Sequence, residues 1–506
     1  MKRIFLLVGL FIIGTFVYTV SLLQYIYISS LNSVLPGGIV LYIIEAFLWL
    51  VALGIAIRIL LKQTYAYNKS YWIIIILLNP MLGILLYMIF ARDFTKRKFE
   101  KTRPLIPSKA FLGFEENTFP HYENHPYGDI FKFIHDTSGR SVYENDTSVE
   151  ILNNGDEFFP QLIRELKKAN EYIVMEFYII KTDKIGRLVL DVLKQKALEG
   201  VKVYIIYDHV GSNKHLDKAY MKDLINCGVK VEAFEPQELS IFNTNLNFRN
   251  HRKATVIDGT VGFMGGMNLG DEYNHDSPKF GFWRDTHILI RGNGVTSIQN
   301  VFIKDWYYIT SDVLDLKMNK SAEKMEGLFT VMESGPDFED GLIRDAYIKM
   351  IHHARKSVKI VTPYLIIEPE LLNAIKIARR SNVEVDLLLP GKHDYVMVGF
   401  ATLSYYEQLL AMGVRIYEYK DHFVHSKILI IDNELASVGS VNIDPRSFHL
   451  NFEVTGIFLN HAVQRLVSSF EQDKELSNQI TAENWQKRSI FQRLLQGLFN
   501  LFSPIF

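Results

Sequence analysis

Two stretches of the sequence repeat one pattern of residues, and this pattern decides how the rest of the chain is read. The first runs from His251-Arg252-Lys253 through Asp258 to Gly265-Gly266-Met267-Asn268, and the second from His425-Ser426-Lys427 through Asp432 to Gly439-Ser440-Val441-Asn442. Both follow the pattern H-x-K-x4-D-x6-G-(G/S)-x-N. One isolated H-x-K would carry little weight, but agreement at several independent positions in two copies is hard to obtain by chance.

The spacing inside each copy fits a β-strand that ends in a tight turn. Alternate side chains of a strand point to the same side, so the histidine and the lysine of each copy share a face. The mainly apolar residues after each lysine predict a buried strand, and the glycines permit a tight turn and a close backbone approach to a ligand. Asn268 and Asn442 then bring an amide donor back toward the same pocket.

The segments around the two motifs also repeat, which predicts an α/β fold with two similar lobes. Beyond about residue 130, short β-rich runs alternate with helical runs. Tyr172–Tyr178 is echoed by Val358–Tyr364, and further echoes follow in the same order in both halves. This order indicates a tandem duplication. We therefore predict a first lobe over residues 131–315 and a second lobe over residues 316–506, with the active site between them.

Two histidines, two lysines and two asparagines around one point suit chemistry at a phosphodiester. Lysine and asparagine can hold the non-bridging oxygens, and the imidazoles can attack and protonate. A lone histidine beside a lysine on a strand is usually structural or solvated, but the paired motif argues against that interpretation. No set of residues has the spacing of metal ligands. We expect neither a metal nor a cofactor.

The start of the chain predicts a membrane anchor. Apolar stretches cover residues 4–28, 39–61 and 71–91, and each reaches the roughly 20 residues that a helix needs to cross the hydrocarbon core. A cleaved signal peptide is the alternative for the first stretch, but it is too long and lacks an A-x-A-like site. Asn79-Pro80 interrupts the third stretch, because proline removes a helical hydrogen bond. We predict two transmembrane spans followed by a re-entrant or kinked hairpin at 71–91.

Basic residues beside these stretches predict the side of the membrane on which the lobes lie. A basic run between Arg92 and Arg103 favours the cytoplasm under the positive-inside rule. The charged N-terminus favours the same side. Both ends of the anchor can lie in the cytoplasm only if the third stretch does not fully cross the membrane. We predict a multi-pass protein of the cell membrane, with an anchor over residues 1–103, a linker over 104–130 and cytoplasmic catalytic lobes.

The composition bounds the partners of the protein. The chain has 506 residues, with 55 Lys and Arg against 56 Asp and Glu. Proteins that bind duplex nucleic acid usually carry a basic excess, so the near-neutral charge argues against a phosphodiesterase that acts on nucleic acid. We expect a lipid bilayer as partner and no nucleic acid, while the oligomeric state stays open. The single cysteine, Cys227, excludes an intramolecular disulfide.

This arrangement resembles the phospholipase D superfamily, whose mark is the duplicated H-x-K-x4-D motif, over about residues 130–480. The resemblance implies that one histidine becomes a phosphohistidine, while the other protonates the leaving group and then activates the acceptor, without a metal. It also implies a carboxylate from outside the motif that orients each histidine, for which Asp285 and Glu453 are the candidates. Asp258 and Asp432 look more structural. The predicted catalytic residues are His251, Lys253, Asp258, His425, Lys427 and Asp432, supported by Asn268, Asn442, Asp285 and Glu453.

Longer stretches are similar to the bacterial cardiolipin synthases within that superfamily. They include Asn250–Lys253, Trp283–Thr286, Asp305-Trp306, Gly439–Phe448 and Asn451–Glu453. The resemblance implies that a phosphatidyl group moves from one phosphatidylglycerol to another through His251, which gives cardiolipin and glycerol. The alternative is a membrane-bound hydrolase of the phospholipase D type, which would share every catalytic residue and release phosphatidic acid. An inactive scaffold would have lost a motif residue, and none is lost.

The C-terminal tail also matches that family in position. Basic and apolar residues alternate at helical spacing between Lys487 and Pro504. This pattern fits an amphipathic helix on a membrane surface, and it fits a packed C-terminal helix equally well.

Overall fold

The computed structural model describes residues 36–61, 66–90, 125–234, 248–276, 279, 281–317, 326–336, 341–420 and 422–501. They belong to two compact units, one of N-terminal helices and one that contains both predicted lobes. The apolar stretch at 4–28, the basic run at 92–103 and the linker as far as residue 124 lie outside the described residues.

The N-terminal unit is built from apolar helices. Its described part comprises α2 (Pro36–Leu60), α3 (Ala66–Leu78) and α4 (Pro80–Phe90). The break between α3 and α4 falls at Asn79, whose side-chain oxygen accepts a hydrogen bond from the backbone N of Leu82 at 3.1 Å. A small apolar cluster that includes Ala52, Ile76 and Tyr87 joins the helices. Within the described ranges, no helix combines the length and the apolar character that a membrane crossing requires.

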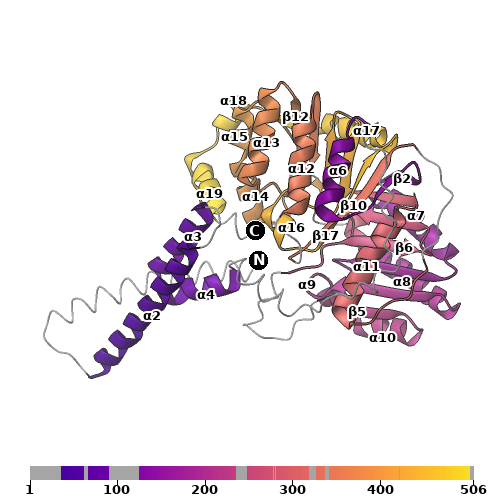
Figure 1. Ribbon diagram of the computed structural model, residues 1–506, viewed down its shortest axis with the longest axis horizontal. Coiled ribbons are helices and arrows are strands. Elements are labelled where there is room, and N and C mark those ends of the chain that lie inside the picture. Colours follow the sequence, from indigo (N-terminus) through magenta and orange to yellow (C-terminus); the bar gives the residue numbers. More distant parts are fainter. Residues whose placement is uncertain are drawn as a thin grey trace. The chain divides into compact units, whose positions relative to one another are not determined.

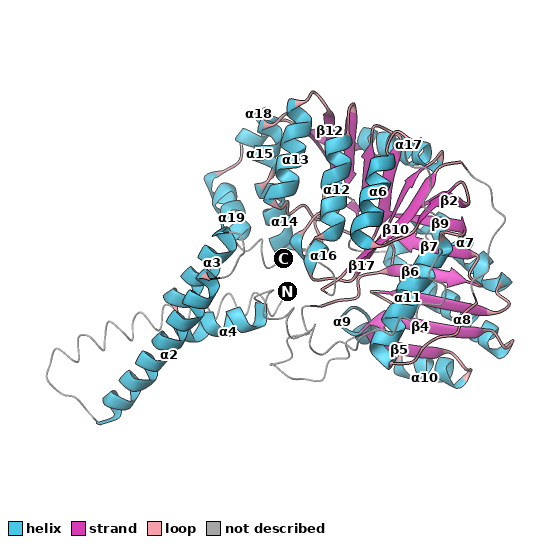
Figure 2. Ribbon diagram, in the orientation of Figure 1, coloured by secondary structure: helices cyan, strands magenta, loops and turns pink. Residues whose placement is uncertain are grey.

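The unit that contains both lobes has two large sheets (Figures 1 and 2). Their strand orders match. From edge to edge, the first is β2 (Thr147–Asn153), β9 (Thr286–Gly292), β7 (Val261–Gly265), β6 (Lys253–Ile257), β3 (Tyr172–Phe177), β4 (Lys202–Asp208) and β5 (Lys230–Phe234). The second is β10 (Leu328–Ser334), β17 (Glu453–Leu459), β16 (Leu435–Gly439), β15 (Ile428–Ile431), β11 (Ser357–Val361), β12 (Glu384–Pro390) and β13 (Arg415–Tyr419), with β1 (Val142–Glu144) and β18 (Ser477–Ile480) added at its edges. The predicted α/β duplication is therefore confirmed.

The duplication has a different register and a different boundary from those predicted. The backbone O of Tyr172 accepts a hydrogen bond from Asp258 N, and that of Ser357 accepts one from Asp432 N. Ser357 therefore corresponds to Tyr172, so the predicted echo, which matched Tyr172 with Val358, is wrong by one residue. In addition, β1 pairs with β10. The segment around β1, which the sequence assigned to the first lobe, thus extends the second sheet.

Helices flank both sheets, and a shared core fills the space between the two sheets. Those of the first half are α7 (Asn154–Lys168), α8 (Lys184–Leu198), α9 (His209–Ser212), α10 (Lys218–Asn226) and α11 (Val295–Thr310). The others are α6 (Gly128–Ser138), α12 (Leu342–His353), α13 (Pro369–Arg380), α14 (Val396–Ser404), α15 (Tyr406–Ala411), α16 (Pro445–His449), α17 (Ala462–Glu475), α18 (Ala482–Gln486) and α19 (Ile490–Leu501). Short 3-10 turns cover Asn213–His215 and Asp271–Asn274.

Strand alternation sorts the apolar side chains between the outer layers and this shared core. In β3, Ile173 and Met175 pack under α7 and α8, whereas Val174 faces α11 and the other lobe. The shared core joins residues of both sheets, among them Met264 of β7 and Val438 of β16. The two lobes are thus one packed body, and polar groups at their boundary are held by both.

Candidate active site

The two H-x-K segments lie where the lobes exchange backbone hydrogen bonds. His251 N donates to Phe452 O at 2.9 Å, and Phe452 N donates to Arg249 O at 2.9 Å. In the other copy, β14 (Phe423–Val424) pairs in parallel with β8 (Trp283–Arg284). His425 N then donates to Arg284 O at 2.7 Å. Each catalytic segment is therefore placed beside a segment of the opposite lobe.

Each histidine meets a buried carboxylate from the opposite lobe. His251 Nδ1 lies 2.9 Å from Glu453 Oε1 and 3.0 Å from Glu453 Oε2. His425 Nδ1 lies 2.7 Å from Asp285 Oδ2. Both carboxylates are fully buried. An ionised carboxylate only accepts hydrogen bonds, so Nδ1 donates and Nε2 is the ring atom left for a substrate.

The charges inside the site keep the carboxylates ionised and the imidazoles neutral. Although burial opposes it, His425 and Lys427 lower the pKa of Asp285 to about 2. The pKa of Glu453 is likewise lowered by His251 and Lys253 against the effect of burial. Burial lowers the pKa of His251 to about 4 and that of His425 to about 3, and the positive charges of both lysines act in the same direction on each ring. Because each lysine lowers the pKa of both imidazoles, the two motifs form one site.

Both motif lysines are buried beside their own histidines. Lys253 Nζ donates to His251 O at 2.5 Å, and Lys427 Nζ donates to His425 O. Burial lowers the pKa of Lys253 to about 7 and that of Lys427 to about 8. Two cations without full solvation are suited to a bound phosphate monoanion, which would also restore their usual pKa values.

The two motif asparagines have different partners. Asn268 Oδ1 accepts from Ile179 N at 3.0 Å, and its Nδ2 donates to Tyr273 Oη at 2.7 Å. Asn442 is buried, and its Oδ1 has no hydrogen-bond partner within the described ranges. Position 266 of the first copy must be a glycine, because the Cβ atom of any other residue would lie 2.1 Å from Asp285 Oδ1.

The motif aspartates lie at the opposite ends of their strands from the histidines. Asp258 accepts hydrogen bonds from the backbone N–H groups of residues 170–172, and Asp432 accepts from those of residues 355–357. Both adopt positive φ angles, 50° and 52°. Among the described residues, no hydrogen bond or ion pair joins Asp258 or Asp432 to His251 or His425. Their contacts are those of turn-forming residues, as the more structural interpretation of the sequence expects, and their catalytic role stays a prediction.

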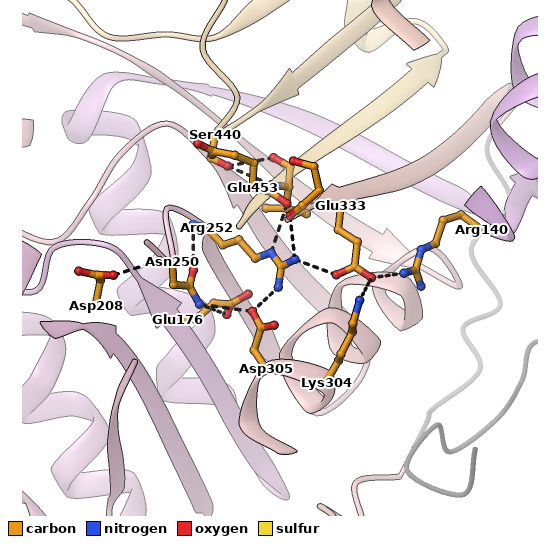
Figure 3. A network of polar contacts seen from close by, with 12 residues as sticks. Arg140, Glu176, Asp208, Asn250, Arg252, Lys304, Asp305, Glu333, Ser440 and Glu453 are labelled. Carbon is orange, nitrogen blue, oxygen red and sulfur yellow. Dashed lines mark hydrogen bonds and ion pairs between the residues drawn. The ribbon is translucent and has the colours of Figure 1, made fainter. Parts of the chain in front are cut away.

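A buried polar network behind His251 was not predicted from the sequence (Figure 3). It is centred on Arg252, the variable residue of the motif, and on Asp305 of α11. The residues drawn with labels in the figure are Arg140, Glu176, Asp208, Asn250, Arg252, Lys304, Asp305, Glu333, Ser440 and Glu453. The available signal was the run of charged residues inside otherwise apolar segments, since such groups are rarely buried without partners.

The fold and the site together define an enzyme class: duplicated α/β lobes that share one two-histidine site for phosphodiester chemistry. A family model described as "Cardiolipin synthase, PLD-like domain" matches residues 162–279 and 347–474. Cardiolipin synthase 2 of Bacillus cereus is 38% identical over 455 residues, which cover 88% of this chain and 88% of the relative. The major cardiolipin synthase ClsA of Bacillus subtilis is 36% identical over 469 residues, which cover 89% of this chain and 96% of the relative. The chain belongs to the cardiolipin synthase family.

A solved structure shares the fold at low sequence identity. The phosphatidylserine synthase of Haemophilus influenzae superposes with a TM-score of 0.57 at 14% identity, over 74% of this chain and 97% of that one. This similarity concerns the architecture of the lobes alone.

Proposed function

We propose that the chain makes cardiolipin by transferring a phosphatidyl group from one phosphatidylglycerol to a second one. The observation that carries the proposal is the crossed pairing of His251 with Glu453 and of His425 with Asp285. It gives two neutral imidazoles with free Nε2 atoms in one site, as required by a reaction with a covalent intermediate and a separate proton carrier. Membership of the cardiolipin synthase family supports the lipid substrate and the transfer.

The first half-reaction forms a phosphohistidine. His251 Nε2 attacks the phosphorus of phosphatidylglycerol, and the bond between phosphorus and the headgroup glycerol oxygen breaks. His425 is neutral in the free site, but the negative charge of the bound substrate favours its protonated form. In that form it gives its Nε2 proton to the departing oxygen, so glycerol leaves. Lys253 and Lys427 neutralise the charge on the non-bridging oxygens, which is the role that buried cations serve best in a site with little water.

The second half-reaction returns both histidines to their starting states. His425, now neutral, takes the proton from the free headgroup hydroxyl of a second phosphatidylglycerol. The resulting oxygen attacks phosphorus, the bond to His251 Nε2 breaks, and cardiolipin forms. Water competes for the same step, so a site that admits lipid alcohol and excludes water favours transfer over hydrolysis.

We also propose that the protein acts at the bilayer, anchored by residues 1–103 as a multi-pass segment with the lobes on the cytoplasmic side. Two kinds of surface support this proposal. The N-terminal helices expose large apolar side chains, such as Phe47 and Leu50. The C-terminal α19 exposes Ile490, Phe491 and Leu494 on one side. The rings of Phe499 and Phe400 stack with centroids 5.6 Å apart, which places α19 against α14.

A product analysis separates transfer from hydrolysis. Purified protein would be incubated with phosphatidylglycerol in mixed micelles, and the lipids would be identified by mass spectrometry. We expect cardiolipin and glycerol in equal amounts. Phosphatidic acid as the sole lipid product would overturn the proposal in favour of a phospholipase D-type hydrolase. For the membrane proposal, a reporter fused after Arg103 is expected to be active only in the cytoplasm, and activity only outside the cell would contradict it.

A further inference from the structure

The residue between the histidine and the lysine of the first motif is a buried arginine. Arg252 has no exposed surface and lies immediately before β6, which begins at Lys253. Figure 3 shows its guanidinium directed toward acidic side chains from both lobes. A buried arginine destabilises the fold unless its charge and its donors are matched.

The guanidinium bonds to the backbone at Glu453 and to the neighbouring strand. Arg252 Nε donates to Glu453 O at 3.2 Å. Its Nη2 donates to Glu333 Oε2 at 2.9 Å and to Ser334 O at 3.3 Å. Ser334 of β10 lies opposite Glu453 of β17 in the sheet. Arg252 thus joins a strand of the first lobe to the two strands that present the carboxylate partner of His251.

The same network joins both sequence neighbours of His251 to helix α11. Asp305 Oδ2 accepts from Arg252 Nη1 and also from Asn250 Nδ2, the latter at 3.3 Å. Asn250 Nδ2 lies 3.3 Å from Glu176 Oε2 as well, and Asn250 Oδ1 accepts from Arg252 N at 3.0 Å. The residues on both sides of His251 are therefore bonded to Asp305 of α11, and Asn250 also contacts Glu176 of β3.

Further charges complete the network on its outer side. Arg140 and Lys304 both contact the Oε1 atom of Glu333, Lys304 at 3.2 Å. Although burial opposes it, these cations and Arg252 lower the pKa of Glu333. Glu333 is thus an anion between three cations, of which Arg252 also bonds to Glu453 O of β17.

The second copy of the motif is supported differently. Ser426 stands where the first copy has Arg252, and its hydroxyl forms a hydrogen bond with Thr286 Oγ1 at 3.1 Å. The carbonyl of Asp285 accepts instead from Arg284 Nη1, at 2.6 Å, within its own lobe. The carbonyl of Glu453 accepts from a cation of the opposite lobe. The carbonyl of Asp285 accepts from a cation of its own lobe, Arg284, whose Nε donates to Asp473 Oδ2 of α17 across the lobe boundary at 2.7 Å.

We propose that Arg252 is a positioning residue that fixes Glu453 against His251 Nδ1 across the lobe boundary. The kinetic consequences below rest on the proposed function, because they require His251 to be the nucleophile. Displacing Glu453 by a few tenths of an ångström would weaken its bond to Nδ1 while leaving the second half-site and the phosphate-binding lysines in place.

The test compares Arg252→Lys with wild type in the phosphatidylglycerol assay. Lysine keeps the charge but lacks the planar fork that reaches Glu453, Glu333 and Asp305 together. We expect kcat to fall about 10- to 100-fold, as for other outer partners of a functional histidine. The KM for phosphatidylglycerol should stay within about twofold, because Lys253 and Lys427 are untouched. The carboxylate raises the pKa of His251, so the acidic limb of the kcat profile should move to lower pH in the variant.

Arg140→Gln is the matched control, because it removes a cation from the same Glu333 carboxylate and leaves Arg252 with its bond to Glu453 O in place. It should lower the melting temperature while leaving kcat and its pH profile unchanged. If Arg252→Lys does not fold, Arg252→Gln combined with Asp305→Asn removes the ion pair as a neutral unit and should give the same kinetic defect. A folded variant of either kind with the kcat and pH profile of Arg140→Gln overturns the positioning role. A wild-type protein that makes no cardiolipin overturns the proposed function instead.

Discussion

The two half-sites share a motif and a sheet order but differ in what surrounds them. His251 contacts Tyr178 with ring centroids 5.0 Å apart, and charged groups lie behind its strand. His425 lies among aromatic rings, with Trp283 at 5.3 Å and Phe423 at 5.8 Å between centroids, and both a neutral hydroxyl pair and the Arg284–Asp473 ion pair lie beside it. Duplication therefore supplied two equivalent imidazoles, and divergence of the residues beside them supplies two different environments. A nucleophile and a proton carrier need such a difference, because they perform different steps.

The largest expected effect distinguishes the roles of the two histidines. His251→Ala and His425→Ala should each lower cardiolipin formation about 10³-fold or more, because each removes a group that the reaction uses directly. Intact-protein mass spectrometry after a short exposure to phosphatidylglycerol should detect a phosphatidyl adduct only when His251 is present. An adduct on the His251→Ala protein would exchange the roles of the two half-sites.

The carboxylate partners should give the next largest effect. Glu453→Gln and Asp285→Asn keep the size of the side chain but remove the negative charge that fixes each imidazole. We expect kcat to fall about 10- to 100-fold in each. The Glu453 variant should slow adduct formation in a single turnover, and the Asp285 variant should slow its transfer to the acceptor. If both variants slow adduct formation and its transfer to the acceptor equally, the two half-sites do not have different functions.

The pH dependence reports on the lysines that both half-sites share. Their pKa values, about 7 for Lys253 and about 8 for Lys427, lie below the usual value because burial disfavours the charged form. The ammonium form that binds phosphate is therefore lost as the pH rises through this range, so kcat/KM should decline above about pH 7 to 8. Lys253→Arg, whose charge does not titrate, should shift the decline upward by leaving only Lys427 to titrate. A kcat/KM that stays constant up to pH 10 would contradict the lowered pKa values of the two lysines.

The motif aspartates should affect stability rather than chemistry. Asp258→Asn and Asp432→Asn each weaken charge-assisted hydrogen bonds to backbone N–H groups. We expect each to lower the free energy of unfolding by about 1.5–3 kcal/mol, measured by urea denaturation. The kcat of the folded fraction should not change. A loss of kcat comparable with that of the histidine variants would place these residues in the reaction.

The smallest expected effect concerns the second motif. Ser426→Ala removes one hydrogen bond between neutral hydroxyl groups, so kcat should change by less than about fivefold. Together with Arg252→Lys, this variant measures the difference between the half-sites directly. A Ser426→Ala defect as large as that of Arg252→Lys would show that the two sites depend equally on the residue behind the strand.

Much of the site was predictable because residue type and spacing are local. His251, Lys253, His425 and Lys427 follow from the motif, in which each histidine stands two positions before its lysine. Glu453 and Asp285 were predicted as orienting residues through family resemblance alone. Their assignment to particular histidines needed the structure, because each carboxylate is far away in the sequence from the ring that it contacts.

Other features had no local signal. Arg252 occupies the variable position of the motif, and a polar residue beside a catalytic strand could equally face solvent. Asn268 was expected to present its amide to the pocket, yet it bonds to Ile179 N and Tyr273 Oη. The pairing of β1 with β10 was missed because a strand of three residues does not specify which sheet edge it joins.

The sequence by itself determined that the chain holds two α/β repeats, each with a histidine and a lysine two positions apart. The strands begin only at Lys253 and Ile428, so both histidines precede the strands on which they were predicted. Periodicity and spacing are properties of neighbouring residues, so they can be read without a fold. Tertiary structure alone decided that the carboxylate of each half-site comes from the opposite lobe, and that a buried arginine bonds across the lobe boundary at each of them, Arg252 to Glu453 O and Arg284 to Asp473. Those contacts arise where two sheets pack against one shared core, and no local pattern encodes which segments meet there.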